Sequence, residues 1–202
     1  MNGAGAALKW IMDYLLAIAA GVFLLPVLLL VAVLIRLDSP GPVLYRHRVL
    51  GKNGRPFDAI KFRTMAQNSH LFFEAHPELK KRFQENFKLK DDPRVTRFGR
   101  ILRRASLDEV PQILNVLRGE MSVVGPRFIS LDEVDKYGPW LEDYFKVKPG
   151  ITGLWQVRGR SDLPYEERVR LDVQYIRGWS LWLDISLILA TIPAVFKKKG
   201  AY

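Results

Sequence analysis

The longest apolar run in the chain lies close to its N-terminus. No side chain from Tyr14 to Ile35 is charged, and as an α-helix this run would be roughly 33 Å long, enough to cross the hydrocarbon core of a bilayer. A secretory signal peptide is a poorer match, because the run exceeds a typical signal-peptide core and no convincing cleavage site follows it. The hydropathy pattern therefore predicts a membrane helix.

Two features of this helix bear on whether it spans the membrane or re-enters the same face. Pro26 lies just past its middle, where proline removes a helical hydrogen bond and clashes with the preceding turn. Basic residues flank both ends, with Lys9 before the run and Arg36, Arg46 and Arg48 after it, whereas a spanning helix usually has an asymmetric basic flank. Kinked spanning helices are common, so the pattern alone favours a spanning helix.

Shorter elements follow the membrane segment. Two β-prone stretches, 43–49 and 57–63, enclose a Gly/Asn turn and predict a hairpin. Helices are expected over residues 69–90, 106–118, 165–177 and 181–196. The first of these is basic and amphipathic, and it suits a membrane surface and an ordinary solvent-exposed position equally well. The last is followed by Lys197–Lys199, which suits an interfacial helix whose lysines meet anionic headgroups.

Charge and cysteine content narrow the classes of partner. The 202 residues suit one compact domain plus an anchoring segment. The 31 Lys and Arg against 21 Asp and Glu give a net charge of +10, which favours nucleic acid, phospholipid headgroups or phosphorylated small molecules. A nucleic-acid-binding protein is the weaker interpretation, because the basic residues are dispersed and no recognised binding motif occurs. The absence of cysteine excludes disulfides, thiolate metal sites and cysteine nucleophiles.

Two adjacent carboxylates mark the stretch that carries chemistry. Proline is tolerated only in the first turn of a helix, so Pro111 places a helix start near residues 106–108 and puts Asp108 and Glu109 at that N-terminus. Exposed amides and the helix dipole favour negative charge there, both on carboxylates and on bound phosphate.

This stretch has two interpretations. Arg103, Arg104 and Arg127 lie near the carboxylate pair in sequence and suit forked binding of phosphate, while a hard cation such as Mg²⁺ takes one or two carboxylates plus phosphate oxygens. Ser106 followed by Asp-Glu before an apolar run is also a common capping pattern. The local pattern alone favours capping, so a structural membrane adaptor without chemistry is a rival at this point.

Five motifs occur in an order that identifies a family. They are Lys61-Phe-Arg-Thr-Met65, Ser106-Leu-Asp-Glu-Val-Pro-Gln112, Asn115-Val-Leu-Arg-Gly-Glu-Met-Ser122, Gly125-Pro-Arg127 and Lys148-Pro-Gly-Ile-Thr-Gly-Leu-Trp-Gln-Val-Arg-Gly-Arg160. Together they closely resemble the bacterial sugar transferase family, the monotopic polyprenyl-phosphate phosphoglycosyl transferases, over essentially the whole chain. The stretch Tyr175–Asp184 looks like the catalytic domain of galactose- or glucose-1-phosphate transferases, which usually carry further N-terminal transmembrane helices. A natural short form and an excised domain both fit.

The resemblance implies a chemistry and a place for it. It implies a cytoplasm-facing enzyme of the bacterial inner membrane that moves a sugar-1-phosphate from a UDP-sugar to undecaprenyl (polyprenyl) phosphate and releases UMP. This reaction starts the synthesis of a lipid-linked glycan such as O-antigen, capsule or exopolysaccharide. It further implies that Asp108 attacks the donor's β-phosphate to form a covalent intermediate, and that Glu109, with Asp108 beside it, holds Mg²⁺.

The same resemblance assigns further positions and shows departures. The implied phosphate-binding residues are Lys61, Arg103 and Arg127, and the candidate nucleotide contacts are Gln156, Arg158, Arg160 and Asp172. Leu25 precedes Pro26 where the family often has serine, Phe128 replaces the proline of Gly-Pro-Arg-Pro, and Lys148 replaces the arginine of Arg-Pro-Gly. None of these departures touches the Asp-Glu pair.

Histidines and tryptophans are weaker candidates. His47, His70 and His76 lack the spacing of a metal site and are expected to be ordinary surface residues. Trp155, Trp179 and Trp182 are expected in core or interface packing rather than stacked on uracil.

The sequence and the resemblance together predict a small mixed α/β domain with a helix-associated β-hairpin. Residues 1–37 are expected to form a re-entrant helix–break–helix, which the resemblance favours over a spanning helix. Residues 38–202 are expected to form a cytoplasm-facing catalytic domain with amphipathic helices on the membrane surface. The expected partners are a UDP-sugar donor, a polyprenyl phosphate acceptor and the phospholipid membrane, without nucleic acid; homo-oligomer formation is left open.

Overall fold

The computed structural model describes residues 3–67, 69, 71–86, 89, 92–159 and 162–196. Its helices and strands are α1 (Gly3–Asp38), β1 (Leu44–Leu50), β2 (Pro56–Phe62), α2 (Phe72–Ala75), α3 (Pro77–Asn86), α4 (Arg97–Arg104), α5 (Ile113–Leu117), β3 (Ser122–Val124), α6 (Val134–Tyr137), α7 (Leu141–Phe145), β4 (Gly150–Thr152), α8 (Leu154–Arg158), α9 (Tyr165–Arg177) and α10 (Leu181–Phe196). Short 3₁₀ helices are η1 (Lys52–Gly54), η2 (Leu107–Gln112), η3 (Leu131–Glu133) and η4 (Gly138–Trp140). The predicted mixed helix-and-sheet domain is confirmed, as are the hairpin and the two C-terminal helices.

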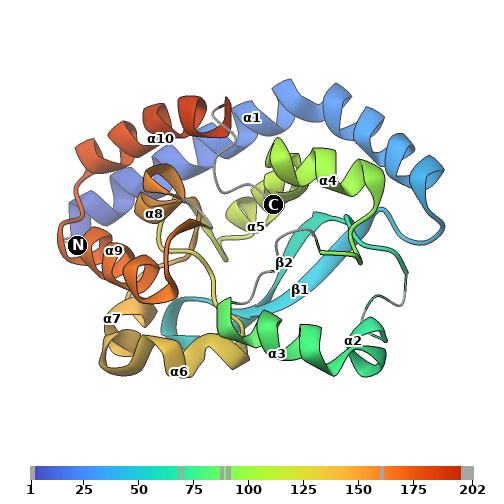
Figure 1. Ribbon diagram of the computed structural model, residues 1–202. Helices are drawn as coiled ribbons and strands as arrows, with labels where there is room; N and C mark the ends of the chain where they lie inside the picture. Colours follow the sequence, from blue (N-terminus) through green and yellow to red (C-terminus); the bar gives the residue numbers. More distant parts are fainter. Residues whose placement is uncertain are drawn as a thin grey trace.

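The long apolar helix α1 is continuous through Pro26 and arches along one side of the molecule (Figure 1). A proline inside a helix is a common cause of such a bend, so the predicted break appears as a change of direction within one helix. Within the described part of the chain, α1 is the helix long and apolar enough to cross a membrane. Its outward side chains are uncovered, with Phe23 82% exposed, which is the pattern of a surface in contact with lipid.

The N-terminal half of α1 is attached to the rest of the protein by polar contacts. Lys9 Nζ donates to Asp184 Oδ2 of α10 at 2.7 Å and to the Val124 carbonyl at 3.0 Å. The Tyr14 hydroxyl donates to the Leu117 carbonyl at 2.8 Å. These bonds fix the start of α1 against β3, α5 and α10.

The C-terminal half of α1 is attached by apolar packing. Val31 and Ile35 form a buried cluster with Phe62 of β2 and Leu102 of α4. Arg36 Nη1 donates to the Gly41 carbonyl at 2.6 Å and so orders the turn that follows the helix. Both halves of α1 therefore contact the same domain, α10 lying beside one half and α4 beside the other (Figure 1).

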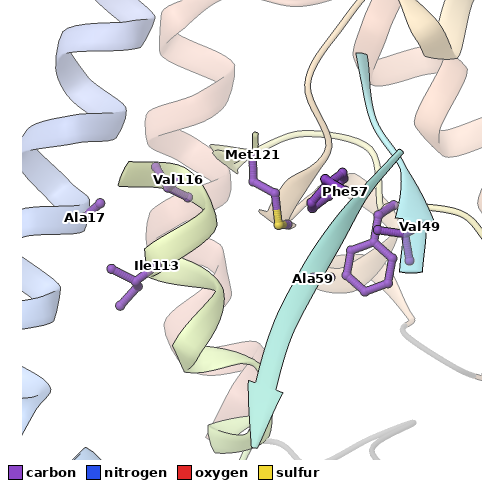
Figure 2. Close-up of a cluster of buried hydrophobic side chains, with 8 residues drawn as sticks. Ala17, Val49, Phe57, Ala59, Ile113, Val116 and Met121 are labelled. Atoms are coloured by element: carbon purple, nitrogen blue, oxygen red, sulfur yellow. The ribbon is translucent and has the colours of Figure 1, made fainter. Parts of the chain in front are cut away.

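The β1–β2 hairpin forms one wall of the core. The strands pair antiparallel from Leu44 opposite Phe62 to Leu50 opposite Pro56. Figure 2 shows side chains of both strands meeting α5, the Met121 side chain and α1 in one buried cluster. Its members are Ala17, Val49, Phe57, Ala59, Ile113, Val116, Met121 and Phe128.

Asn115 takes the place of a third strand on the free edge of β2. Its Oδ1 accepts from the Ile60 amide at 2.9 Å, and its Nδ2 donates to the Asp58 carbonyl at 2.7 Å. Glu120 Oε2 accepts a second bond from Nδ2 at 2.7 Å. A side-chain amide that satisfies both groups of a strand edge mimics a peptide, which explains structurally why asparagine opens this motif.

Two predicted helices are divided in the structure. The segment predicted as one helix over 69–90 forms α2 and α3, separated at His76, because a residue before proline disfavours the helical conformation; residues 70, 87, 88 and 90 lie outside the described part. Helix α3 lies on the side of the molecule opposite α1 (Figure 1), which favours the solvent-exposed interpretation. The segment 106–118 forms η2 and then α5.

Candidate active site

Five charged side chains from four segments of the chain converge on one site. Lys61 comes from β2, Arg103 from the last turn of α4, Asp108 and Glu109 from η2, and Arg127 from the loop after β3. The charges of Glu109, Lys61, Arg103 and Arg127 all act on the pKa of Asp108. We call these five residues the Asp108 cluster. The sequence-based grouping of these residues is thus reproduced by the fold, across 67 positions of the chain from Lys61 to Arg127.

Ser106 turns the chain so that the two carboxylates face this cluster. Its φ of 55° is left-handed, a conformation that costs a non-glycine residue of order 1–3 kcal/mol and often marks functional sites. Its side chain makes no capping hydrogen bond. Ser106 thus holds the N-cap position, with Asp108 and Glu109 in the first turn as expected, but without the hydrogen bond of the capping interpretation. The continuous helix expected over 106–118 begins instead as the 3₁₀ helix η2, which contains Pro111.

Asp108 is buried beside a like charge. Burial and the neighbouring Glu109 carboxylate raise its pKa above the ordinary value, while Lys61, Arg103 and Arg127 act to lower it. Burial and repulsion from Glu109 favour the protonated carboxyl group, whereas the three cations favour the ionised carboxylate. The site thus combines a buried carboxylate with nearby positive charge that suits an anion.

Arg127 forms the firmest contact in the cluster. Its Nη2 donates to Glu109 Oε1 at 2.7 Å. Burial acts to lower the pKa of Arg127, but the charge of Glu109 and its hydrogen bond outweigh burial and raise it. The guanidinium also lies 4.7 Å from the centre of the Phe128 ring, so an aromatic face supports it.

The backbone around Arg127 is fixed from two sides. The Tyr144 hydroxyl donates to the Arg127 carbonyl at 2.9 Å. Just before it, Gly125 N donates to the Thr152 carbonyl of β4 at 2.9 Å. A Cβ on Gly125 would lie 2.7 Å from the Gly150 nitrogen, so glycine is required for this approach. The Gly-Pro-Arg and Lys-Pro-Gly motifs therefore form one packed unit that aims Arg127.

Arg103 is held by the motif that follows β2. Its Nε donates to Thr64 Oγ1 at 3.0 Å, and burial lowers its pKa, against the charges of Asp108 and Asp92. Thr64 in turn packs against Gly99 of α4, where a Cβ would clash with its backbone. Sequence reasoning did not single out Thr64, because nothing local indicates a partner 39 positions away.

Lys61 completes the cluster from the sheet. Burial lowers its pKa, and the charges of Glu109 and Asp108 oppose this shift. Its Nζ lies 5.7 Å from the centre of the Tyr45 ring on the paired strand. A further anion near a buried lysine stabilises the charged form of that lysine. A phosphate oxygen could be that anion.

Comparison with known proteins accords with this geometry. The profile of the family described as bacterial sugar transferase matches residues 4–198. The chain belongs to the bacterial sugar transferase family. It is therefore a transferase, and the prediction from the five motifs is confirmed.

Three relatives illustrate the range of the family. The exopolysaccharide production protein ExoY of Sinorhizobium fredii is 44% identical over 202 residues, which are 98% of this chain and 89% of that protein. The undecaprenyl-phosphate galactose phosphotransferase of Salmonella typhimurium is 44% identical over 166 residues, 80% of this chain and 35% of the relative. The UDP-glucose:undecaprenyl-phosphate glucose-1-phosphate transferase of Escherichia coli is 39% identical over 212 residues, 100% of this chain and 43% of the relative. The chain spans less than half of these last two relatives.

The departures from the family pattern lie outside the carboxylate pair. Phe128 is buried under the Arg127 guanidinium, so it replaces proline with a supporting ring. Burial lowers the pKa of Lys148, and the charges that act on it are those of Asp13, Lys52 and Lys9. Lys148 is thus oriented toward α1 rather than serving as a phosphate ligand in the Asp108 cluster.

The structure describes only some of the residues predicted to contact the nucleotide, and these do not form one site. Gln156 lies against Gly153, and both polar atoms of its amide are buried without a partner among the described residues. Arg158 is exposed at the end of α8. Arg160 lies outside the described residues. Trp155 is buried, as expected, and Trp179 donates to Asp184 at 3.0 Å, so neither is free to stack on uracil.

His47 is misassigned by the sequence. It was expected at the surface, but it is half-buried beside the Asp108 cluster, with its ring centre 5.8 Å from that of Phe128. Burial and the charges of Lys61 and Arg127 lower its pKa to about 4. The missing signal was the hairpin register, which sets His47 opposite Ala59 and one diagonal step from Lys61.

Asp172 lies behind Arg127 rather than at the site surface. It is fully buried, and the Tyr137 hydroxyl donates to its Oδ2 at 2.8 Å. Burial raises its pKa to about 8, although the Tyr137 hydrogen bond and the Arg127 backbone and charge act to lower it. This burial makes it a support for the Arg127 loop, and the sequence-based assignment as a nucleotide contact finds no support in its position.

The raised pKa of Asp172 predicts a pH-dependent stability. Because the folded state prefers the protonated form, its contribution is complete below the ordinary pKa of 3.8 and is lost as pH rises through about 8. Asp172→Asn, which is neutral at every pH, is expected to remove a slope of up to about 1.4 kcal/mol per pH unit between pH 5 and 8. Unfolding by urea in detergent at several pH values measures this; parallel curves for the two proteins would refute it.

The Asp108 cluster supplies two carboxylates as ligands for a hard divalent cation, which is fewer than a complete coordination shell. Asp108 and Glu109 supply adjacent carboxylates whose mutual repulsion raises the pKa of Asp108. Among the described residues no group of three or more His, Cys, Asp and Glu side chains converges to form a closed metal cage. Mg²⁺ commonly takes one or two carboxylates and completes its shell with water and substrate phosphate, and the pair fits that mode.

Proposed function

We propose that this sugar transferase moves a sugar-1-phosphate from a UDP-sugar to undecaprenyl phosphate and releases UMP, the first lipid-linked step of an exopolysaccharide or related glycan. The observation that carries the proposal is the Asp108 cluster, in which a buried aspartate and a second carboxylate lie among three cations. Such a set binds a diphosphate and presents a nucleophile to it. The names of the relatives, which include a galactose phosphotransferase and a glucose-1-phosphate transferase, support it.

Asp108 is the nucleophile of the first step in this proposal. A carboxylate oxygen forms a bond to the β-phosphorus of the donor, the bond from that phosphorus to the bridging oxygen breaks, and UMP leaves with the electron pair. Lys61, Arg103 and Arg127 hold the phosphate oxygens and offset the charge that repels the incoming carboxylate. Fixed cations in a buried site stabilise the transition state more than mobile ones in water.

The second step returns the enzyme to its starting state. A phosphate oxygen of undecaprenyl phosphate attacks the same phosphorus, the bond to Asp108 breaks, and the carboxylate is regenerated. Because the two substrates react in turn, one set of cations serves a soluble donor and a lipid acceptor. Glu109 and Asp108 would hold Mg²⁺, which supplies further positive charge to the diphosphate, while Arg127 orients Glu109.

The attachment of α1 supports a re-entrant arrangement on the cytoplasmic leaflet of the inner membrane. Lys9 near its start and Ile35 near its end both contact the same domain. A spanning helix would set its ends about 30 Å apart on opposite faces of the bilayer. These two contacts support a helix that returns to the face from which it entered.

Helix α10 adds a second lipid-facing surface. Its exposed apolar residues recur at helical spacing, and they are Trp182, Ile185, Leu189 and Ile192. The opposite face packs on the core through Leu187. An amphipathic helix of this kind rests in the interface, beside the N-terminal half of α1 (Figure 1).

Cysteine labelling tests this topology. The chain has no native cysteine, Gly3 has nothing within 4 Å of an added Cβ, and Leu37 is 78% exposed, so Gly3→Cys and Leu37→Cys introduce single accessible thiols. Both are expected to react with a membrane-impermeant maleimide only when the cytoplasmic face is exposed, as in inverted vesicles. Labelling of the two variants from opposite faces would establish a spanning helix and contradict the proposal.

UMP release tests the reaction itself. Detergent-solubilised protein with Mg²⁺ is assayed against UDP-galactose, UDP-glucose and other UDP-sugars, with and without undecaprenyl phosphate. Lipid-dependent UMP release from one donor is the expected result and also names the sugar. Silence across the whole panel, in protein with a cooperative thermal transition, would count against the proposed donor class.

A further inference from the structure

One polar group beside the Asp108 cluster has no role in the proposed phosphate chemistry. His47 lies on β1, its ring flanked by Tyr45 at 6.2 Å and by the edge-on ring of Phe128 at 5.8 Å, centre to centre. The charges of Lys61, Arg127 and Glu109 act on it. It therefore lies within reach of the groups that would hold the donor's diphosphate.

The imidazole of His47 lacks an internal partner. Its Nδ1 is buried and has no hydrogen-bond partner among the residues that the structure describes. Buried polar atoms are nearly always hydrogen-bonded, so an exception needs an explanation. His76 shows the usual case, since its Nδ1 lies 3.0 Å from the Phe72 carbonyl. The unsatisfied nitrogen of His47 points to a partner that arrives with the substrate.

The surroundings of His47 define the chemistry of that partner. Burial and the cations Lys61 and Arg127 keep the ring neutral near pH 7, so His47 adds no charge for a phosphate. A neutral imidazole carries one donor and one acceptor nitrogen, which matches a hydroxyl group. The half-exposed Tyr45 ring beside His47 supplies apolar surface that suits the C–H face of a sugar ring.

The covalent structure of the donor selects among its hydroxyls. In a UDP-sugar the hexose is bonded directly to the β-phosphate, whereas ribose and uracil lie beyond the α-phosphate. A group next to the residues that hold the attacked phosphate therefore meets the hexose first. On the basis of the proposed function, we propose that His47 hydrogen-bonds a hydroxyl of the donor's hexose and helps to select which hexose is transferred.

The test compares two replacements of His47 with a matched control. His47→Leu removes both ring nitrogens at similar volume, His47→Asn keeps an amide near the position of Nδ1, and His76→Leu makes the same change at the histidine that is already satisfied. For each protein, kcat/KM is measured with UDP-galactose and with UDP-glucose, which differ only at the C4 hydroxyl. The inhibition constant of UDP, which has both phosphates and no hexose, is measured alongside.

The expected result separates a sugar contact from a general defect. His47→Leu lowers kcat/KM for the better donor about tenfold or more, lowers it less for the poorer donor, and leaves UDP inhibition within about twofold. His47→Asn recovers much of the loss, and His76→Leu matches the wild type.

Other outcomes overturn the inference. Equal losses for both donors together with weaker UDP inhibition would assign His47 to phosphate binding or to the fold. Unchanged kinetics in His47→Leu would show that it contacts no part of the donor. An inactive wild-type protein would instead overturn the proposed function, and this inference with it.

Discussion

Replacing Asp108 by asparagine is expected to abolish sugar-phosphate transfer while the protein stays folded. Asparagine keeps the shape of the side chain but cannot form the acyl phosphate of the proposed first step. Loss of a nucleophile of this kind lowers turnover by about 10⁴-fold or more. The measurement is lipid-dependent UMP release by the variant and the wild type under identical conditions.

The fold is expected to tolerate this change for an electrostatic reason. Burial and the charge of Glu109 raise the pKa of Asp108, so without substrate the folded state disfavours its ionised form. A neutral amide removes that repulsion. The melting temperature of Asp108→Asn should therefore equal or exceed that of the wild type near pH 7, which separates lost chemistry from lost structure.

A mass measurement makes the test sharper. Wild-type protein incubated with the UDP-sugar but without lipid acceptor is expected to gain the mass of one sugar phosphate, and Asp108→Asn is expected to gain none. The matched control is Asp135→Asn, the same change at an exposed position of α6, which should behave as the wild type. Appreciable turnover by Asp108→Asn, or the same adduct on it, would refute the assignment of the nucleophile.

The sequence is informative where the cause of structure is local or the motif is long. Two β-prone stretches around a Gly/Asn turn predict the β1–β2 hairpin, and in the structure Asn53 and Gly54 of that turn have positive φ, which these residue types tolerate. Four residues of the Asp108 cluster lie in the five motifs, and the family resemblance assigns the fifth, Arg103, as well. Neither the hydropathy pattern nor the charge balance alone selects Asp108 over an ordinary helix cap.

The sequence does not predict a residue's position where its contacts come from distant parts of the chain or where tertiary packing overrides the local conformational preference. The Ser106 pattern has every feature of a helix cap, yet its backbone is left-handed and turns the chain into η2. His47 looks like a surface residue until the strand register is known. Asp172 lies in a family-like motif, but its complete burial behind Arg127 follows from the packing of α9. These three cases depend on tertiary contacts, which override local propensity.

The tertiary contact that the sequence indicates least is the ion pair between Lys9 and Asp184, which lie 175 positions apart. Asp184 is fully buried and accepts from Lys9, from the Tyr175 hydroxyl at 2.7 Å and from the Trp179 indole at 3.0 Å. A lysine before one apolar run and an aspartate inside another thus attach the N-terminal half of α1 to α10. No sequence pattern indicates that they pair.

Replacing Lys9 by methionine is expected to give the largest stability loss of any single change proposed for this protein. Methionine fills similar space, but it leaves the Asp184 carboxylate buried without its cation and beside Asp13, whose Oδ1 lies 3.9 Å from Nζ in the intact protein. Removing one partner of a buried ion pair costs about 3–5 kcal/mol. The free energy of unfolding in detergent measures the loss, with Lys52→Met at an exposed position as the control.

The double variant Lys9→Met/Asp184→Asn decides whether the charge or the packing carries the effect. If the unpaired charge dominates, the double variant is less destabilised than the sum of the single variants by at least about 1 kcal/mol. Additive losses would show that Lys9 and Asp184 act separately. The contact also reaches the loop that carries Arg127, because Lys9 and Tyr175 both donate to the carbonyl of Val124, the last residue of β3 before Gly125-Pro-Arg127. Loss of the Lys9 contact is therefore expected to reduce kcat as well as stability, since Val124, at the end of the strand that leads to Arg127, loses one of its two side-chain donors.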